Sequence, residues 1–318
     1  MIKRYIQVNS INIMFNFIRK FYYWGISYDW VLAFLKNDMG SILAGDAIEY
    51  QLVKNPYGDR WFADPFILDV TENEYILLVE ELLYTSKYAR IAQLTIDKST
   101  LEIKDSKPIL ELDSHLSFPA ILRKGNNIYI YPESSQTGTL TLYQYDVKEN
   151  SCERKQILCN QPLTDAVLFE KEGQEIILST QLPYPNNQQL GIYMRHQNTG
   201  LFELHQEVIF KDNVARNAGT IISYNDKYFK TSQDCNVRYG GGLVVFEMLF
   251  DEGKWKFEEK VRIKSPSKRY DLGIHTLNCH KGVYVVDLLG YRHPFVGHIL
   301  LFLKRTYFYL FRNRKHNI

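Results

Sequence analysis

The chain has 318 residues, of which 45 % are hydrophobic and 23 % charged, the proportions of an ordinary folded protein and not of a disordered or collagen-like one. A net charge of +2, with no basic stripe through residues 40–260, excludes the electrostatic footprint of a nucleic-acid-binding protein. Aromatic residues reach 14 %, which suits half-buried β-strands and also suits stacking against sugar rings.

Residues 1–28 form a basic and aromatic N-terminal extension. Its apolar stretch is interrupted by Asn9, Asn12 and Asn16 and then by Arg19 and Lys20, which makes a poor signal peptide. No window reaches the roughly 18 apolar residues that a membrane-spanning helix needs. The four cysteines show neither the paired spacing of a zinc site nor the density of a disulfide-stapled domain. We therefore expect a cytoplasmic protein with reduced thiols.

Residues 29–292 contain a repeat of about fifty residues, the length of one propeller blade. Five segments align, and their first residues are separated by 54, 47, 53 and 57 positions. The segments are Asp64–Leu68, Phe118–Leu122, Asp165–Phe169, Ala218–Ile222 and His275–Cys279. We therefore predict an all-β fold, a five-bladed β-propeller with short helical or aromatic extensions at both ends.

Each aligned segment leads through a short polar turn into a second apolar strand, such as residues 75–79 after the turn 71–74. Turn residues between β-branched and aromatic runs indicate a hairpin. A β-sandwich also has many short strands and is the alternative. The propeller is favoured because polar residues recur at one phase of the repeat, which would place all of them on one end of a ring.

The recurring polar residues are expected to surround a central pocket. Before or at the start of the first strand stand Asp64, His115 with Ser117, Asp165, Arg216 with Asn217, and His275. After the second strand stand Glu80 with Glu81, Glu133, Thr180 with Gln181, and Gln233 with Asp234. Carboxylates and amides in one ring are suited to binding polyols, so we predict a carbohydrate site. Taken singly, each acid also fits a solvated strand end, each histidine fits a core histidine, and Arg216 fits a salt bridge between blades.

Residues 293–318 form an apolar and aromatic segment that ends in Arg312, Arg314 and Lys315. This composition suits an amphipathic helix in the membrane interface, with basic residues near anionic headgroups. A terminal helix packed against the propeller is the equal alternative. The interfacial helix predicts peripheral membrane contact at the inner face of the membrane.

Seven ordered motifs resemble one family, the propeller domain at the N-terminus of glucosamine inositolphosphorylceramide transferases, which also occurs as stand-alone bacterial proteins. The motifs are Trp61–Phe66, His115–Pro119, Tyr131–Ser134, Asp165–Phe169, Ala215–Gly219, Ser232–Cys235 with Tyr239 and Gly240, and His275–Asn278. That domain is similar in turn to the five-bladed propellers of arabinanases, β-xylosidases and levansucrases. Through these motifs Trp61 and Tyr239 join the expected substrate-binding residues.

The resemblance to those glycosidases implies a base or nucleophile at Asp64 and an orienting acid at Asp165. It also implies a general acid in the fourth blade, where this chain has Arg216 and Asn217 instead. Hydrolysis of a glycoside needs a carboxylic acid to protonate the leaving oxygen. Glu133 or Asp234 could supply that proton from another blade, and Arg216 could instead bind an anionic leaving group such as a diphosphate.

We therefore expect a carbohydrate-active enzyme of surface-polysaccharide or glycolipid biosynthesis that transfers a glycosyl unit, with Asp64, Asp165 and Glu133 as its catalytic residues. Its substrate would be a glycan, a sugar nucleotide or a lipid-linked sugar. A glycoside hydrolase and a non-catalytic glycan-binding propeller are the alternatives. No cofactor and no catalytic metal are predicted, although a structural cation in the central channel near His275 is compatible with the sequence.

Overall fold

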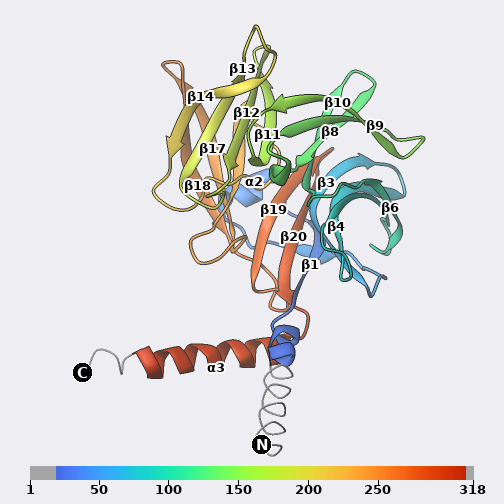
Figure 1. Ribbon diagram of the computed structural model, residues 1–318, viewed down its shortest axis with the longest axis vertical. Helices are drawn as coiled ribbons and strands as arrows, with labels where there is room; N and C mark the ends of the chain where they lie inside the picture. Colours follow the sequence, from blue (N-terminus) through green and yellow to red (C-terminus); the bar gives the residue numbers. More distant parts are fainter. Residues whose placement is uncertain (1–18, 313–318) are drawn as a thin grey trace, which may run out of the picture.

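The computed structural model describes residues 19–312 and shows a five-bladed β-propeller, which confirms the predicted fold class. Residues 1–18 of the predicted N-terminal extension, and residues 313–318 with Arg314 and Lys315, lie outside the described residues. Five separate four-stranded antiparallel sheets, and not two packed sheets, make up the ring, so the β-sandwich alternative is wrong (Figure 1).

The first three blades are consecutive in sequence, and each consists of four strands in chain order. Blade one is β3 (Arg60–Val70), β4 (Glu74–Leu83), β5 (Arg90–Asp97) and β6 (Ile103–Leu110). Blade two is β7 (Ser117–Lys124), β8 (Asn127–Glu133), β9 (Leu140–Asp146) and β10 (Ser151–Cys159). Blade three is β11 (Leu163–Lys171), β12 (Gln174–Gln181), β13 (Gln189–Arg195) and β14 (Phe202–Ile209).

The fourth blade continues this pattern, whereas the fifth joins the two ends of the chain. Blade four is β15 (Ile222–Tyr224), β16 (Lys227–Gln233), β17 (Leu243–Asp251) and β18 (Lys254–Ile263). Blade five takes β19 (Gly273–His280) and β20 (Val283–Tyr291) from the end of the propeller and β1 (Tyr28–Leu35) and β2 (Tyr50–Leu52) from its beginning. Blue β1 therefore lies beside orange-red β20 in Figure 1, and this pairing closes the ring.

The hydrophobic core lies between neighbouring blades. Buried clusters join each blade to its neighbours, and the one between blades four and five also contains Met39 and Ile42 of the short helix α2 (Met39–Ala44). Asp38 caps α2, since its side chain accepts a hydrogen bond from the Ser41 amide at 2.8 Å. The alternating apolar residues of each strand thus fill the wedge between adjacent sheets, and polar residues are left at the strand ends.

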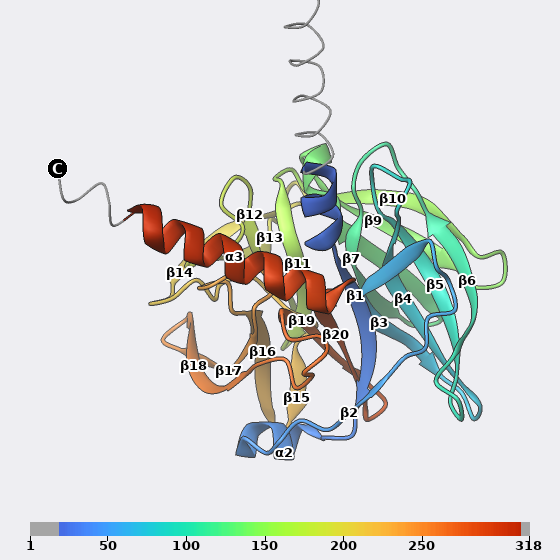
Figure 2. The ribbon, with the colours of Figure 1, turned by 90° about the horizontal axis from the view of Figure 1, so that it is seen from below.

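Two helical pieces lie at one end of the ring. Residues 19–25 are helical immediately before β1, and α3 (Pro294–Arg312) follows β20. A single 3₁₀ turn, η1 (Ser135–Thr137), follows β8. Figure 2 shows that α3 crosses this end of the propeller in front of the inner strands β11, β19 and β20. The starts of the inner strands lie at the same end, because the start of β19 pairs with the end of β20, from which α3 leaves.

Candidate functional site

Four of the five repeat segments share a backbone irregularity at their first residues. In blades one, two, three and five the inner strand carries one extra residue at this phase, between Ala63 and Phe66, Ser117 and Ala120, Thr164 and Val167, and Ile274 and Leu277. A bulge of this kind leaves residues unpaired and turns their side chains and amides out of the ladder. The recurring polar phase of the sequence is therefore a ring of bulges.

At three of these bulges the backbone has a left-handed conformation. The φ angles are +49° at Asp64, +46° at Phe118 and +45° at Asp165. Non-glycine residues adopt this conformation at a cost, which Asp and Asn tolerate better than most. All three residues are buried, with exposed fractions of 3 %, 0 % and 2 %. The two predicted acids are thus held in a strained backbone on the floor of the central site.

One group of side chains joins blades five, one and two. The Asp287 carboxylate accepts hydrogen bonds from the amides of His275 (3.2 Å), Thr276 (3.0 Å) and Asp64 (2.8 Å), which are all bulge residues. The Asp64 carboxylate in turn accepts from the Phe118 amide at 2.9 Å. Each acid therefore binds the bulge of the next blade around the ring.

His275 lies between the two carboxyl groups of this cluster. Its Nδ1 is 2.7 Å from Asp287 Oδ1, and its Nε2 is 3.3 Å from Asp64 Oδ1. Burial, followed by the negative charges of Glu80, Asp165 and Asp287, raises the pKa of Asp64 well above its ordinary value. His275 thus links the carboxyl groups of blades five and one through its two ring nitrogens.

A second group joins blades two, three and four through Arg216. Its Nε donates to Asp165 Oδ2 at 2.6 Å and its Nη2 donates to Glu133 Oε2 at 3.2 Å, while Gln233 Nε2 donates to Asp165 Oδ2 at 2.7 Å. The Asn217 amide donates to the Asp165 carbonyl oxygen at 2.7 Å. The structure therefore brings these five predicted residues together, and Arg216 forms the salt bridge between blades that was one of its two sequence interpretations.

Glu133 belongs to the same group and lies nearer to solvent than Asp165. Its side chain is 12 % exposed, its Oε2 accepts from the Asp165 amide at 3.0 Å, and its Oε1 accepts from the Ser135 hydroxyl at 3.0 Å. Burial raises the pKa of Glu133 to about 8, although the Arg216 guanidinium acts in the opposite direction. A carboxyl group with this pKa holds a proton at neutral pH and can donate it.

Aromatic rings connect the two groups. Tyr239 lies edge-on to His275, with ring centroids 5.4 Å apart, and its face is 4.9 Å from the Arg216 guanidinium carbon. Trp30 stacks on His275 at 3.9 Å. Gly240 makes this packing possible, since a Cβ at its position would lie 2.7 Å from the His275 Cβ. Tyr239 is 40 % exposed, so an aromatic ring forms part of the rim of a polar site, an arrangement suited to stacking against a sugar.

His115 lies on the rim next to blade one. Its Nε2 is 3.0 Å from Glu80 Oε1, and its side chain is 37 % exposed. Burial works against protonation of His115, but the hydrogen bond and the charge of Glu80 outweigh it, so the pKa of His115 is raised. The accessible part of the site is therefore formed by Glu133, His115 and Tyr239, above a buried floor of acids and amides.

Three predicted residues lie away from this cluster. Glu81 is fully buried and accepts hydrogen bonds from Arg60 (2.7 Å) and Arg90 (2.6 Å), so it stabilises blade one. Strand residues alternate in direction, and it is the neighbouring Glu80 that faces His115. Asp234 accepts from Arg262 at 3.2 Å and from the Asn236 amide at 3.1 Å, which fixes its own loop.

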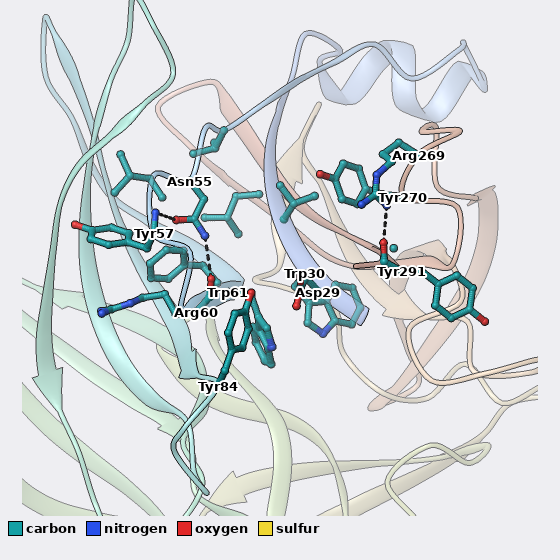
Figure 3. A pocket seen from close by; sticks show the side chains of 16 residues that line it. Asp29, Trp30, Asn55, Tyr57, Arg60, Trp61, Tyr84, Arg269, Tyr270 and Tyr291 are labelled. Carbon is teal, nitrogen blue, oxygen red and sulfur yellow. Dashed lines mark hydrogen bonds between the residues drawn. The ribbon is translucent and has the colours of Figure 1, made fainter. Parts of the chain in front are cut away.

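Trp61 is the third such residue, and it lines a separate cavity of about 190 Å³ between blades five and one (Figure 3). Polar groups of this cavity are bonded to one another: Arg269 donates to the Tyr291 carbonyl at 2.7 Å, and Asn55 donates to the Arg60 carbonyl at 3.1 Å. The cavity shares Trp30 and Tyr291 with a groove of about 420 Å³ that lies beside Tyr239.

Asp287, Trp30 and Lys230 are site residues that the sequence did not reveal. Asp287 interrupts the apolar run of β20, and this interruption was the available signal. Lys230 is fully buried in β16, where its ammonium donates to the Ala215 carbonyl at 3.1 Å and burial lowers its pKa to about 7. Lys230 lies between Phe229 and Thr231, a setting that gave no comparable signal.

One set of described residues has the composition of a cation site. Asp64, His275 and Asp287 offer ligand atoms within 4.8 Å of one another. All three are buried, and the Asp287 oxygens already accept hydrogen bonds from amides. A structural cation near His275 stays a prediction, and these are the residues that would bind it.

Comparisons with known proteins agree with this architecture. The chain is 26 % identical over 196 residues to glucosamine inositolphosphorylceramide transferase 1 of Arabidopsis thaliana, which covers 58 % of this chain and 25 % of that protein. The corresponding protein of Oryza sativa subsp. japonica is 25 % identical over 141 residues, covering 42 % and 19 %. The chain thus spans at most a quarter of the length of these relatives.

A solved structure of a thermostable family-43 glycoside hydrolase superposes on this chain with a TM-score of 0.50 at 14 % identity. The superposition covers 69 % of this chain and 84 % of that one, and it supports the propeller fold. The family model of the N-terminal domain of glucosamine inositolphosphorylceramide transferase 1 matches residues 50–281. These residues contain all five repeat segments and every predicted site residue. The resemblance of the seven motifs is therefore confirmed, and the chain belongs to the family of glucosamine inositolphosphorylceramide transferase 1 N-terminal domains.

Proposed function

We propose that this propeller acts in glycosyl transfer during the assembly of a surface polysaccharide or a glycolipid, at the end of the ring where Glu133, His115 and Tyr239 reach the solvent. The family and the names of the curated relatives, which are glycosyltransferases acting on a lipid, support this proposal. Because the chain spans only part of those relatives, their activity comes to this chain as a proposal and not as a finding.

The observation that carries the proposal is the bridge that Arg216 makes between Asp165 and Glu133. It connects three blades and keeps a proton-bearing carboxyl group, Glu133, at the edge of a buried polar floor. In this proposal Glu133 donates a proton or a hydrogen bond to the sugar, and Asp165 orients Arg216. The raised pKa of Asp64 makes its carboxylate a stronger base, which suits it to accept a proton from the acceptor hydroxyl.

Transfer from an activated donor would account for an arginine, and not an acid, at the start of blade four. The bond from the anomeric carbon to the leaving group breaks, the acceptor oxygen forms the new bond, and its proton passes to the base. A diphosphate leaves as an anion and needs positive charge more than an acid. Arg216 stands at the phase where the related glycosidases have their acid, and it would supply that charge by exchanging its hydrogen bond to Glu133 for one to the leaving group.

A glycoside hydrolase is the second candidate, and the pKa of Glu133 favours it. Hydrolysis requires a protonated carboxyl group beside the leaving oxygen, and Glu133 meets this requirement at neutral pH. A structure with a bound sugar would separate the mechanisms further: a distance of about 5 Å between the Asp64 and Glu133 carboxyl groups indicates a retaining pair and roughly 6.5 to 9.5 Å an inverting pair.

The function is tested by offering the purified chain two sets of probes. Nucleoside-diphosphate sugars are assayed for release of the nucleoside diphosphate in the presence of total membrane glycolipid. Aryl glycosides are assayed for release of the phenol. We expect turnover with the first set and at least a 100-fold loss in Asp64→Asn, the usual contribution of a general base. Glu153→Gln, an exposed residue of β10, is the matched control and should retain activity.

Three results would count against this assignment. Turnover of aryl glycosides alone would assign the chain to the hydrolases. Binding of glycans without turnover of either set, weakened by Asp64→Asn and Asp165→Asn, would make it a binding module. Full transfer activity in those two variants would remove the central site from the mechanism altogether.

A further inference from the structure

The helix α3 is fixed at its start to the end of the ring that carries the candidate site. Gly25 packs against Val296 and Leu300 so closely that a Cβ would lie 2.5 Å from the Leu300 Cδ1. Trp24 stacks on His293 with ring centroids 4.0 Å apart. The helix then crosses the propeller end (Figure 2), and the groove of about 420 Å³ between them is lined by Trp30, Tyr239, Leu301 and Lys304, among others.

The opposite side of α3 is apolar and exposed. Phe295 is 78 % exposed, Ile299 42 %, Phe302 67 % and Leu303 55 %. Their spacing of four, three and one residues places them on one face of the helix, which we call the apolar stripe. A helix that only packed against the propeller would bury its apolar face and expose a polar one. Here both faces are apolar, so the stripe lacks a partner among the described residues.

The residues before β1 extend this surface. Phe21 is 48 % exposed, Tyr23 62 % and Trp24 47 %, and Phe21 lies 5.5 Å from Trp24 between ring centroids. Trp and Tyr rings are suited to the boundary between water and lipid, because one end of each ring is apolar and the other polar. An exposed apolar surface that includes several aromatic rings marks an interaction site.

Charge is divided between the two ends of the chain and the propeller. Nine of the 38 Lys and Arg residues, and none of the 36 Asp and Glu residues, fall in residues 1–28 and 293–318. The propeller, residues 29–292, therefore has 29 basic and 36 acidic residues. Arg19, Lys20 and Lys304 are exposed in the structure. An anionic surface would attract the helical end of the molecule and repel the propeller, which orients the molecule as well as binding it.

From these observations we propose that the apolar stripe of α3, with Phe21 and Trp24, docks on the surface of an anionic membrane. No helix within residues 19–312 is long and apolar enough to cross a membrane. The stripe would therefore lie in the interface, with its side chains among the lipid headgroups and upper acyl chains. The docked orientation turns the candidate site toward the bilayer. On the proposed function, it follows that the acceptor is a membrane glycolipid, whose sugar reaches Tyr239 through the groove.

The test measures binding of the full chain to vesicles by co-sedimentation. Vesicles of phosphatidylcholine alone are compared with vesicles that contain one quarter phosphatidylglycerol, at 0.1 M and 0.5 M salt. We expect at least ten-fold tighter binding to the anionic vesicles at 0.1 M salt, and weaker binding at 0.5 M, because salt screens exposed charges. The double variant Phe295→Ser, Phe302→Ser should reduce binding by ten-fold or more.

A matched control uses two equally exposed side chains on blade three. Tyr184 is 72 % and Ile209 65 % exposed, and Tyr184→Ser with Ile209→Ser should bind like the wild type. Unfolding temperatures are measured for both double variants to show that they fold. Equal binding to both kinds of vesicle, or unchanged binding by the α3 variant, overturns the proposal. A dimer that the α3 variant dissociates also overturns it, since the stripe would then be a contact between two copies.

These outcomes are separate from those of the functional test. Vesicle binding needs no sugar, donor or turnover, so it succeeds or fails whatever reaction the chain carries out. Conversely, a chain that transfers sugar to a water-soluble acceptor but does not bind vesicles would support the proposed function and contradict membrane docking.

Discussion

Replacement of Glu133 by glutamine tests the site through folding stability, without knowledge of any substrate. Glutamine keeps the shape of the side chain and an oxygen that can accept from the Asp165 amide, now 3.0 Å from Glu133 Oε2. It cannot ionise. The substitution therefore removes the titration of this carboxyl group while most of its contacts are retained.

The magnitude follows from the pKa. Burial raises the pKa of Glu133 from 4.5 to about 8, so between these two pH values the native chain binds a proton that the unfolded chain has lost. The free energy of unfolding consequently falls as pH rises through this interval. The contribution is complete below pH 4.5 and is lost as pH passes about 8. At about 1.4 kcal/mol for each pH unit, its upper limit is about 5 kcal/mol.

Urea denaturation at pH 6, 7, 8 and 9 measures this effect. The free energy of unfolding of Glu133→Gln, minus that of the wild type, should rise by about 2 to 3 kcal/mol over this range. Other titrating groups, such as His115 and Asp64, are present in both proteins and largely cancel. Glu175→Gln is the control, because ion pairs with Lys124 and Arg195 outweigh burial and lower the pKa of Glu175. Its difference from the wild type should be constant.

A difference that stays constant for Glu133→Gln as well would refute the reasoning. It would mean that Glu133 is already ionised at neutral pH, paired with Arg216. Glu133 would then be unsuited to donate a proton, and the hydrolase alternative would lose the observation that favours it.

Three further changes test the structure around the site. Gly219→Ala would place a Cβ 2.1 Å from the Leu277 carbonyl oxygen at a φ of +148°, so urea denaturation should show the free energy of unfolding reduced by about 3 kcal/mol or more. Gly253→Ala, in an open turn, is the control and should reduce it by about 1 kcal/mol. The free energy of unfolding of the wild type, minus that of Lys230→Met, should rise by up to about 3 kcal/mol between pH 7 and 9.5, because the lysine has a pKa of about 7 in the native state and loses its proton at lower pH than in the unfolded chain. Asp287→Asn should lower the free energy of unfolding at pH 7 by about 3 kcal/mol or more, since an NH₂ group would face backbone amides. Unchanged stability in any of the three variants would show that the contact in question is absent or relaxes.

The sequence predicted the ring and the phase of its site because both depend on local and periodic properties. Apolar runs and turns repeat at about fifty residues, and the first residue of four of the five aligned segments lies at a bulge. Closure of the ring was harder to predict, since β1 pairs with β20, more than 200 residues away, and the pattern of β1 does not identify that partner. The predicted boundary at residue 29 includes nearly all of β1 without assigning it to blade five.

Individual side chains were harder to assign for two physical reasons. Adjacent strand residues face opposite sides, so a pair such as Glu80 and Glu81 contributes only one member to a site, and sequence alone does not say which. Buried ionisable residues within apolar strands, such as Asp287 and Lys230, are recognisable only when their partners are known. The partners of Asp287 lie at the bulges of two blades, and no local pattern reveals them.

The same bonds that assemble the site also close the ring, and this determines how the site can be tested. Asp287, Asp64 and Glu133 each accept a hydrogen bond from the amide of a bulge in the next blade. A substitution to alanine would leave that buried amide without an acceptor, which costs about 1 to 3 kcal/mol whether or not the residue takes part in a reaction. Loss of activity in such a variant would therefore say little about chemistry. Asparagine at position 64 retains an acceptor oxygen and tolerates the positive φ, so a loss of transfer in Asp64→Asn with near-normal stability would identify a chemical role, whereas parallel losses of both would identify Asp64 as a bond between blades.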